Sequence, residues 1–149
     1  MSTSTRRDSR VGEPHVGRSF ATLTVIQILI GMEAVAYSVW PPVPTSPIAG
    51  DRTLAVLMFA LAAFSYFAAP RLARWALDLS LGATWLALAA LTASRETAQG
   101  QIILGLAMLV LAVYIAYFLP PRRAFVHVAL LVGAYGVALT LNPQITGPF

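Results

Sequence analysis

Residues 101–141 read QIILGLAMLVLAVYIAYFLPPRRAFVHVALLVGAYGVALTL. Two apolar runs, at about 101–119 and 124–141, flank a turn of two prolines and two arginines. Each run is close to the ~20 residues that an α-helix needs to cross the hydrocarbon core of a bilayer. The runs are continuous and rich in Ala and Leu instead of alternating, which argues against the strands of a membrane barrel. This stretch therefore predicts two antiparallel membrane helices joined by a tight turn.

Three more apolar runs precede this pair, at about 20–40, 53–69 and 72–93. The first ends at Pro41 and the second at Pro70, because proline cannot continue a helix. Backbone polar groups in hydrocarbon must be paired within the chain, and a helix pairs nearly all of its own. The predicted fold class is therefore all-α, a polytopic integral membrane helical bundle with five transmembrane helices.

The composition supports a membrane domain over residues 19–142. The chain has 149 residues, of which 58% are hydrophobic, 11% are charged and none is Cys. A soluble domain of this size exposes much of its chain and cannot hide so much apolar surface. The same figures argue against intrinsic disorder and against a disulfide scaffold. Residues 1–18 are expected to form a disordered basic head, and residues 143–149 a short extracytoplasmic tail.

The ten basic positions, all of them Arg, mark the topology. They lie between the apolar runs and form no patch of the kind that binds nucleic acid. Eight are in the head and in the turns after the second and fourth runs, whereas Arg52 and Arg95 fall on the opposite side. Arg is retained on the cytoplasmic side of membranes. We therefore expect a multi-pass bacterial plasma-membrane protein with a cytoplasmic N-terminus and an extracytoplasmic C-terminus.

Glu33 lies inside the first run, about 4 to 5 Å to the outer side of its centre by helix rise. Tyr37 follows one turn later on the same helix face. Ionisable groups at this depth are costly and mark functional sites by default. One hypothesis is a proton- or ligand-responsive group that faces the bundle interior. The other is a protonated carboxyl that hydrogen-bonds to a neighbouring helix and supports packing.

Asp78, Arg74 and His127 form a second candidate set, near the cytoplasmic ends of the third and fifth runs. Arg74 and Asp78 are one helical turn apart, which predicts a structural ion pair near the interface. His127 lies at a comparable depth, so Asp78 and His127 could meet across two helices and respond to pH. A solitary interfacial histidine is the alternative interpretation.

Motifs that carry catalysis are missing from the sequence. There is no phosphate loop of the form GxxxxGK, no GxSxG and no HExxH. There is no Cys, and His15 lies in the polar head, so the two His residues cannot hold a haem within the membrane. We therefore expect a protein that is not an enzyme, with no catalytic residue, cofactor or metal.

The stretch AYFLPPRRA at 116–124, with Asn142 and Pro143 ending the next run, carries a resemblance. It is similar to the N-terminal multi-span membrane module of actinobacterial GGDEF-type diguanylate cyclases. In that family a sixth span, a linker and a cytoplasmic catalytic domain follow. No sixth span and no GGDEF signature stand before Phe149 here. The resemblance therefore implies a truncated or stand-alone sensory module that does not make cyclic di-GMP.

Three hypotheses for function follow. The first is a non-catalytic sensory or scaffold module that biases a partner through a shift between two helix packings, triggered at Glu33 or in the outer loops. The second is a small proton-coupled transporter that uses Glu33 as its coupling residue. The third is an accessory subunit of a larger membrane complex. The expected partners are the lipid bilayer and either a second copy of the chain or another membrane protein.

The predicted orientation is tested by reporters fused to the chain. A reporter that works only outside the cytoplasm is expected to be active after Phe149, because five crossings place that end outside. The same reporter after Arg123 is expected to be inactive. A reporter active only in the cytoplasm that works after Phe149 would contradict the topology.

Overall fold

A computed structural model describes residues 13–40, 48–67, 75–94 and 98–142. Within these residues every regular element is an α-helix, in the order α1 (Glu13–Val39), α2 (Ile48–Phe67), α3 (Trp75–Ser94), α4 (Ala98–Phe118) and α5 (Pro121–Thr140). All five are long and apolar enough to cross a membrane by length and composition. The described part of the chain is thus all-helical, as predicted.

Four helices begin earlier than the apolar runs suggest: α4 and α5 by about one turn, and α1 and α2 by more. The head was expected to be disordered through residue 18, but α1 is already helical at Glu13. Once a helix has formed, adding residues at its end costs little compared with nucleation, so it extends beyond the apolar run. α2 likewise starts at Ile48, ahead of the expected 53, and Asp51 in its first turn is favoured by the helix dipole. Residues 1–12 and 143–149 lie outside the described residues.

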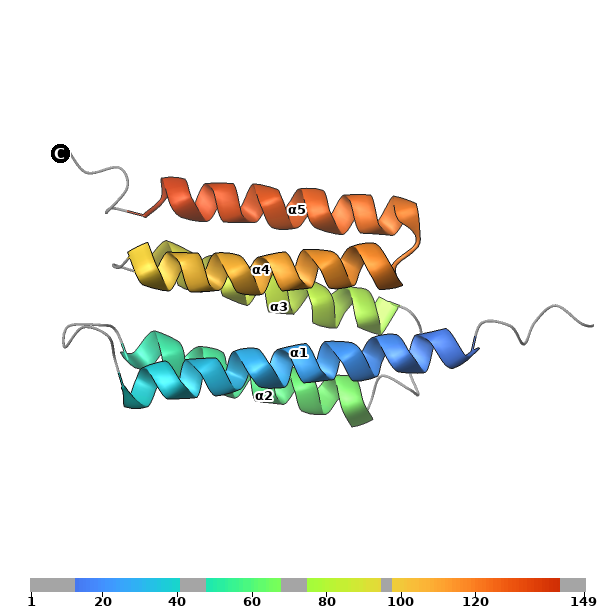
Figure 1. The fold of residues 1–149 in the computed structure, drawn as a ribbon, viewed down its shortest axis with the longest axis horizontal. Coiled ribbons are helices and arrows are strands. Elements are labelled where there is room, and N and C mark those ends of the chain that lie inside the picture. Colours follow the sequence, from blue (N-terminus) through green and yellow to red (C-terminus); the bar gives the residue numbers. More distant parts are fainter. Residues whose placement is uncertain (1–12, 41–47, 68–74, 95–97, 143–149) are drawn as a thin grey trace, which may run out of the picture.

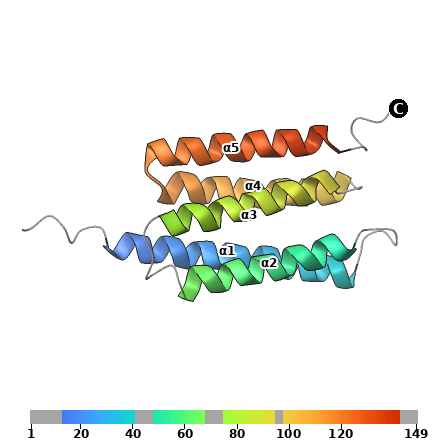
Figure 2. The same ribbon diagram turned by 180° about the vertical axis from the view of Figure 1, so that it is seen from behind.

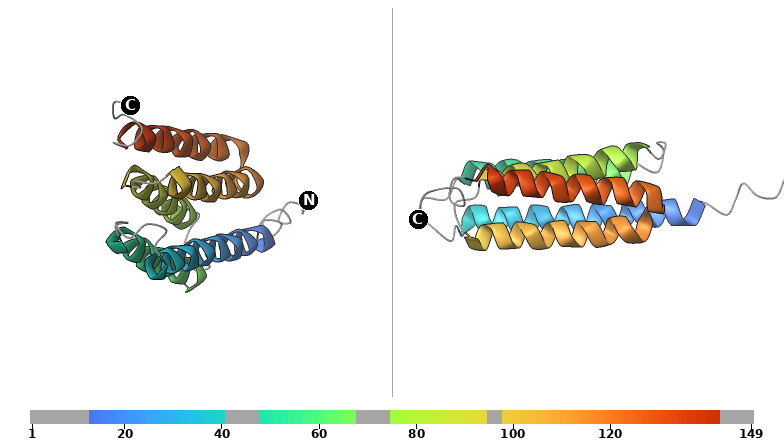
Figure 3. Two further views of the ribbon diagram at one scale, coloured as in Figure 1. Left: turned by 60° about the vertical axis from the view of Figure 1, so that its left-hand side comes forward. Right: turned by 90° about the horizontal axis from the view of Figure 1, so that it is seen from above.

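The helices are arranged in three layers. α1 and α2 form the first, α3 and α4 the second, and α5 packs on the outer side of α3 and α4 (Figures 1 and 3). The N-terminal end of α1 and the turn between α4 and α5 lie at one end of the bundle, and the end of α5 lies at the other (Figures 1 and 2). This alternation is the arrangement that successive crossings require.

The core joins the first two layers. Its most deeply buried apolar side chains come from α1 to α4: Leu23, Met58, Leu81, Leu88, Leu111 and Ile115. The most extensive helix pair is α1 with α2, where Gly31 allows close approach to the Phe59 ring. α5 adds only Leu131 and Ala138 to the buried set and is the least buried helix.

The outward faces are apolar on every helix. Examples are Val56 at 70% exposure, Val113 at 63% and Phe125 at 76%. Water-soluble monomers rarely expose large continuous apolar surface, whereas a helix surrounded by lipid does so along its length. Trp40 and Trp75 stand exposed at helix ends, the position where indole rings favour a membrane interface.

Close packing of α1 on α2 is tested at Gly31. A Cβ at this position would lie 3.2 Å from the Phe59 ring and 3.4 Å from the Met58 Cβ. Gly31→Leu is therefore expected to lower the free energy of unfolding by about 1–3 kcal/mol, as overpacked sites do. Thermal unfolding in detergent micelles, followed by Trp fluorescence, measures the change.

The matched control is Gly133→Ala on α5. Apart from its chain neighbours and the backbone of α5 itself, no atom among the described residues lies within 4 Å of a Cβ built at Gly133. This variant is expected to be neutral or more stable by up to about 1 kcal/mol, since Ala favours a helix over Gly. Equal destabilisation by both substitutions would show that the α1–α2 contact is not specifically constrained.

Candidate functional site

Polar side chains gather at three places between the helices. One lies around Glu33, where the first layer meets the second. Another is a network centred on Gln27 and Ser80, and the third is an ionic cluster around Asp78. Each place joins a different set of helices.

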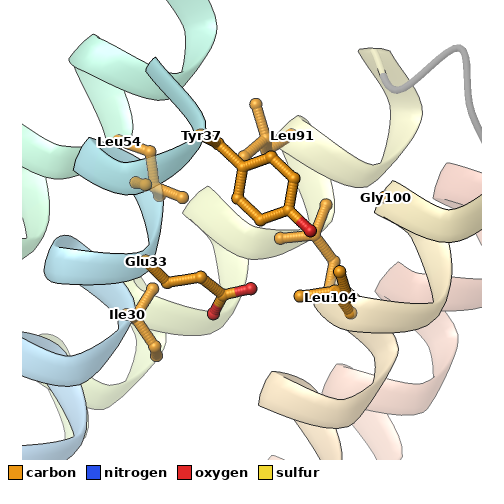
Figure 4. A pocket seen from close by; sticks show the side chains of 9 residues that line it. Ile30, Glu33, Tyr37, Leu54, Leu91, Gly100 and Leu104 are labelled. Atoms are coloured by element: carbon orange, nitrogen blue, oxygen red, sulfur yellow. The ribbon is translucent and has the colours of Figure 1, made fainter. Parts of the chain in front are cut away.

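Glu33 and Tyr37 line the same small cavity. It has a volume of about 10 Å³, which is room for roughly one water molecule. The two side chains come from successive turns of α1 and extend toward α4, and Leu54, Leu91 and Leu104 close the cavity from α2, α3 and α4 (Figure 4). The structure thus brings the two residues together on one face, and that face points to the junction of four helices.

A larger groove adjoins this cavity between α1 and α4. Its volume is about 310 Å³. We call it the α1–α4 groove, and its lining residues are Ile26, Leu29, Ile30, Glu33, Ile103, Leu106, Ala107 and Val110. Glu33, Ile30 and Ile103 border both spaces, so the carboxyl group stands at the boundary between cavity and groove.

A second groove lies on the other side of the cavity, between α2 and α3. It has a volume of about 390 Å³ and shares Leu54 and Leu91 with the cavity. The Glu33 cavity is therefore flanked by a groove on each side, along the seam between the α1–α2 layer and the α3–α4 layer.

Asp78 lies between His127 and Arg123. Its Oδ1 is 3.3 Å from the His127 Nε2, and its Oδ2 is 3.4 Å from an Arg123 terminal nitrogen. The meeting of Asp78 and His127, which was inferred from their matched depth, is thus present. Arg74, the predicted partner on the same helix, lies outside the described residues. Arg123 was not assigned this contact, although its position one turn before His127 places both side chains on one face of α5.

The cluster around Asp78 is only partly shielded from its surroundings. The Asp78 side chain is 30% exposed and Arg123 is 49% exposed, whereas His127 is 13% exposed. Within the described residues the His127 Nδ1 is buried and has no hydrogen-bond partner. The arrangement can hold α3 against α5 electrostatically, and a partly exposed ion pair of this kind contributes modestly to stability.

A buried hydrogen-bond network joins α1, α2 and α3. The Gln27 amide nitrogen donates to the Ser80 Oγ at 3.0 Å and to the Thr84 Oγ1 at 2.9 Å. The Ser65 and Ser80 hydroxyls are 2.8 Å apart. All four side chains are at most 1% exposed. Sequence reasoning missed this network, although a glutamine within an apolar run and hydroxyls at i, i+4 spacing were its visible signals.

Two further hydrogen bonds fasten the ends of helices. The Tyr114 hydroxyl donates to the Ser19 carbonyl at 2.9 Å, which joins α4 to the early part of α1. The Asn142 amide donates to the Thr92 carbonyl at 3.1 Å, which joins the end of α5 to the end of α3. Both side chains are buried, so these bonds form away from competing solvent.

Comparison of the chain with protein-family models, with curated proteins and with solved structures found no match. The resemblance to cyclase membrane modules therefore rests on the stretch 116–124 and on Asn142 and Pro143.

The buried network is tested at Ser80, which contacts both Gln27 and Ser65. Ser80→Ala removes both hydrogen bonds of the hydroxyl and is expected to lower the free energy of unfolding by about 1–2 kcal/mol. Ser38→Ala, which removes a single bond to the Val35 carbonyl at an exposed position, is the control and is expected to change little. If the two variants unfold alike in micelles, the network does not join the helices energetically.

Proposed function

We propose that this protein is a polytopic plasma-membrane protein that works as a non-catalytic sensory or scaffold module. Its responsive site is Glu33 with Tyr37, and its output is a change in how the α1–α2 layer packs against α3 and α4. The N-terminus faces the cytoplasm in this proposal, because the Arg residues concentrate on that side.

The main support for the proposal is the position of the Glu33 cavity. The Glu33 cavity and its two flanking grooves lie along the seam between the first two layers. A change in charge or occupancy at Glu33 therefore acts where the layers meet and where space is left for one to move. Packed interfaces respond to such changes by switching between discrete arrangements, not by continuous deformation.

Hydrogen bonds at Ser19 and Gln27 hold α1 against the second layer of helices. Ser19, near the start of α1, is bonded to α4, and Gln27, at the middle of α1, is bonded to α3. Glu33 and Tyr37 follow in the second half, beside the grooves. A change at Glu33 therefore acts on the part of α1 that follows these bonds, where the α1–α2 layer borders the two grooves. The resemblance to the membrane modules of diguanylate cyclases supports a sensory role of this kind.

A proton-coupled transporter is the second candidate. The α1–α4 groove favours it, since a carboxyl group beside a laterally placed groove can exchange a proton for a substrate. Unchanged proton-coupled uptake in vesicles after Glu33→Gln would remove this candidate. The accessory-subunit hypothesis draws support from the exposed apolar face of α5 and is tested by co-purification of a stoichiometric partner in mild detergent.

The sensory proposal is tested by distance measurements between spin labels. The chain has no Cys, so a pair of introduced cysteines is labelled without background. Met32 on α1 and Val137 on α5, both 58% exposed, report on the layers. In lipid nanodiscs we expect two populations of this distance and a shift in their ratio on Glu33→Gln, because the amide cannot carry the charge that biases the packing.

The control pair is Met32 with Val56 on α2, which lie within one layer and are expected to keep one distance in both backgrounds. A single Met32–Val137 distance that is unaffected by Glu33→Gln would contradict the proposed switch.

A further inference from the structure

We infer that the α1–α4 groove binds a cationic amphiphile, a molecule with one positively charged head and an apolar body, and that the head is held by the Glu33 carboxylate. This inference rests on the proposed membrane function and names the chemical class of ligand at its responsive site.

The groove has the length and polarity of such a molecule. It extends along α1 from Ile26 to Glu33 and along α4 from Ile103 to Val110, about two helical turns or roughly 10 Å by helix rise. α1 and α4 run in opposite directions, so Ile103 lies at the Glu33 end and Val110 at the Ile26 end (Figure 1). The carboxyl group is therefore at one end of the groove and not at its middle.

The walls suit an apolar body that enters from the side. Apart from Glu33, every residue that lines the groove is apolar. Leu29, Leu106 and Val110 at its mouth are 59%, 57% and 53% exposed, whereas Ile30 at its base is 6% exposed. The volume of about 310 Å³ falls at the lower end of the range of pockets that enclose small organic ligands. An amphiphile dissolved in the bilayer would reach this mouth directly.

Charge selects the head group. The lining carries one acidic side chain and no basic one, so a positive head is attracted, an anionic head is repelled and a neutral head gains no ionic term. A carboxylate can accept about four hydrogen bonds through its two oxygens. A quaternary ammonium needs no hydrogen bond and is only weakly hydrated for its size. It therefore suits a groove that is apolar except for one acidic side chain.

The experiment uses three amphiphiles with the same ten-carbon chain: decyltrimethylammonium, decanol and decyl sulfate. Binding of radiolabelled decyltrimethylammonium is measured by scintillation proximity on the full chain in nanodiscs of zwitterionic lipid, with empty nanodiscs subtracted. We expect saturable binding that unlabelled decyltrimethylammonium displaces and that equal concentrations of the other two amphiphiles do not.

Variants of the chain test the contacts of the ligand's head group and of its apolar body separately. Glu33→Gln and Ala107→Phe, which fills the groove, are each expected to weaken binding by about tenfold or more. Asp78→Asn makes the same chemical change at a carboxyl that contacts His127 and Arg123 instead, and it is expected to leave the affinity within about twofold. Thermal unfolding of each variant confirms that the bundle is intact.

Two results would overturn the inference. One is that decanol displaces the labelled cation as effectively as the unlabelled cation does. The other is that the native chain and both groove variants bind the cation equally well. The experiment can overturn the binding site and the sensory switch independently of each other. Binding that depends on Glu33, with no change in the Met32–Val137 distances when the cation is added, supports the site and overturns the switch. Distances that shift on Glu33→Gln without any saturable binding support the switch and overturn the ligand class.

Discussion

The hydrogen bonds from the Gln27 amide to Ser80 and Thr84 join the first layer of helices to the second. In lipid, apolar side chains gain little by leaving their surroundings for a neighbouring helix, because both environments are hydrocarbon. Close packing and buried hydrogen bonds then have to define which helices meet. Gln27, Ser65 and Ser80 are fully or almost fully buried, so their bonds determine how α1, α2 and α3 are rotated about their axes. The direction in which Glu33 and Tyr37 point follows from that rotation.

The number of helices and their order could be predicted from the sequence, since prolines and arginine pairs interrupt five long apolar runs. The ends were less exact: Glu13 and Ile48 are helical although they lie in segments expected to be loop or head. A hydropathy pattern locates the part of a helix that tolerates hydrocarbon. It does not locate the point at which backbone hydrogen bonding stops, because a helix continues into polar surroundings at little cost.

Side-chain partners were harder to predict for a related reason. Depth along a helix follows from residue count, which is why Asp78 and His127 could be matched before their contact was known. Rotation does not follow, because helices that are apolar on all sides present no distinct buried face in the sequence. Arg123 as the second partner of Asp78, and Ser80 as the partner of Gln27, both depend on rotation. The groove beside Glu33 depends on it as well, and so lay beyond sequence reasoning.

The proposed orientation gives the polar groups a functional order along the bundle. Glu33 then lies in the outer half, the Gln27 network deeper, and Asp78 with Arg123 and His127 at the cytoplasmic end. In the proposed mechanism, a change at Glu33 acts on the part of α1 that follows Gln27, and the Gln27 network transmits the change in packing to α3. Because α3 carries Asp78, and Asp78 contacts α5, the change reaches the end of the bundle where Asp78 and Arg123 are partly exposed. An event in the outer half would thereby be presented at the cytoplasmic surface as a rearranged set of charges, which is a form that a partner protein can recognise.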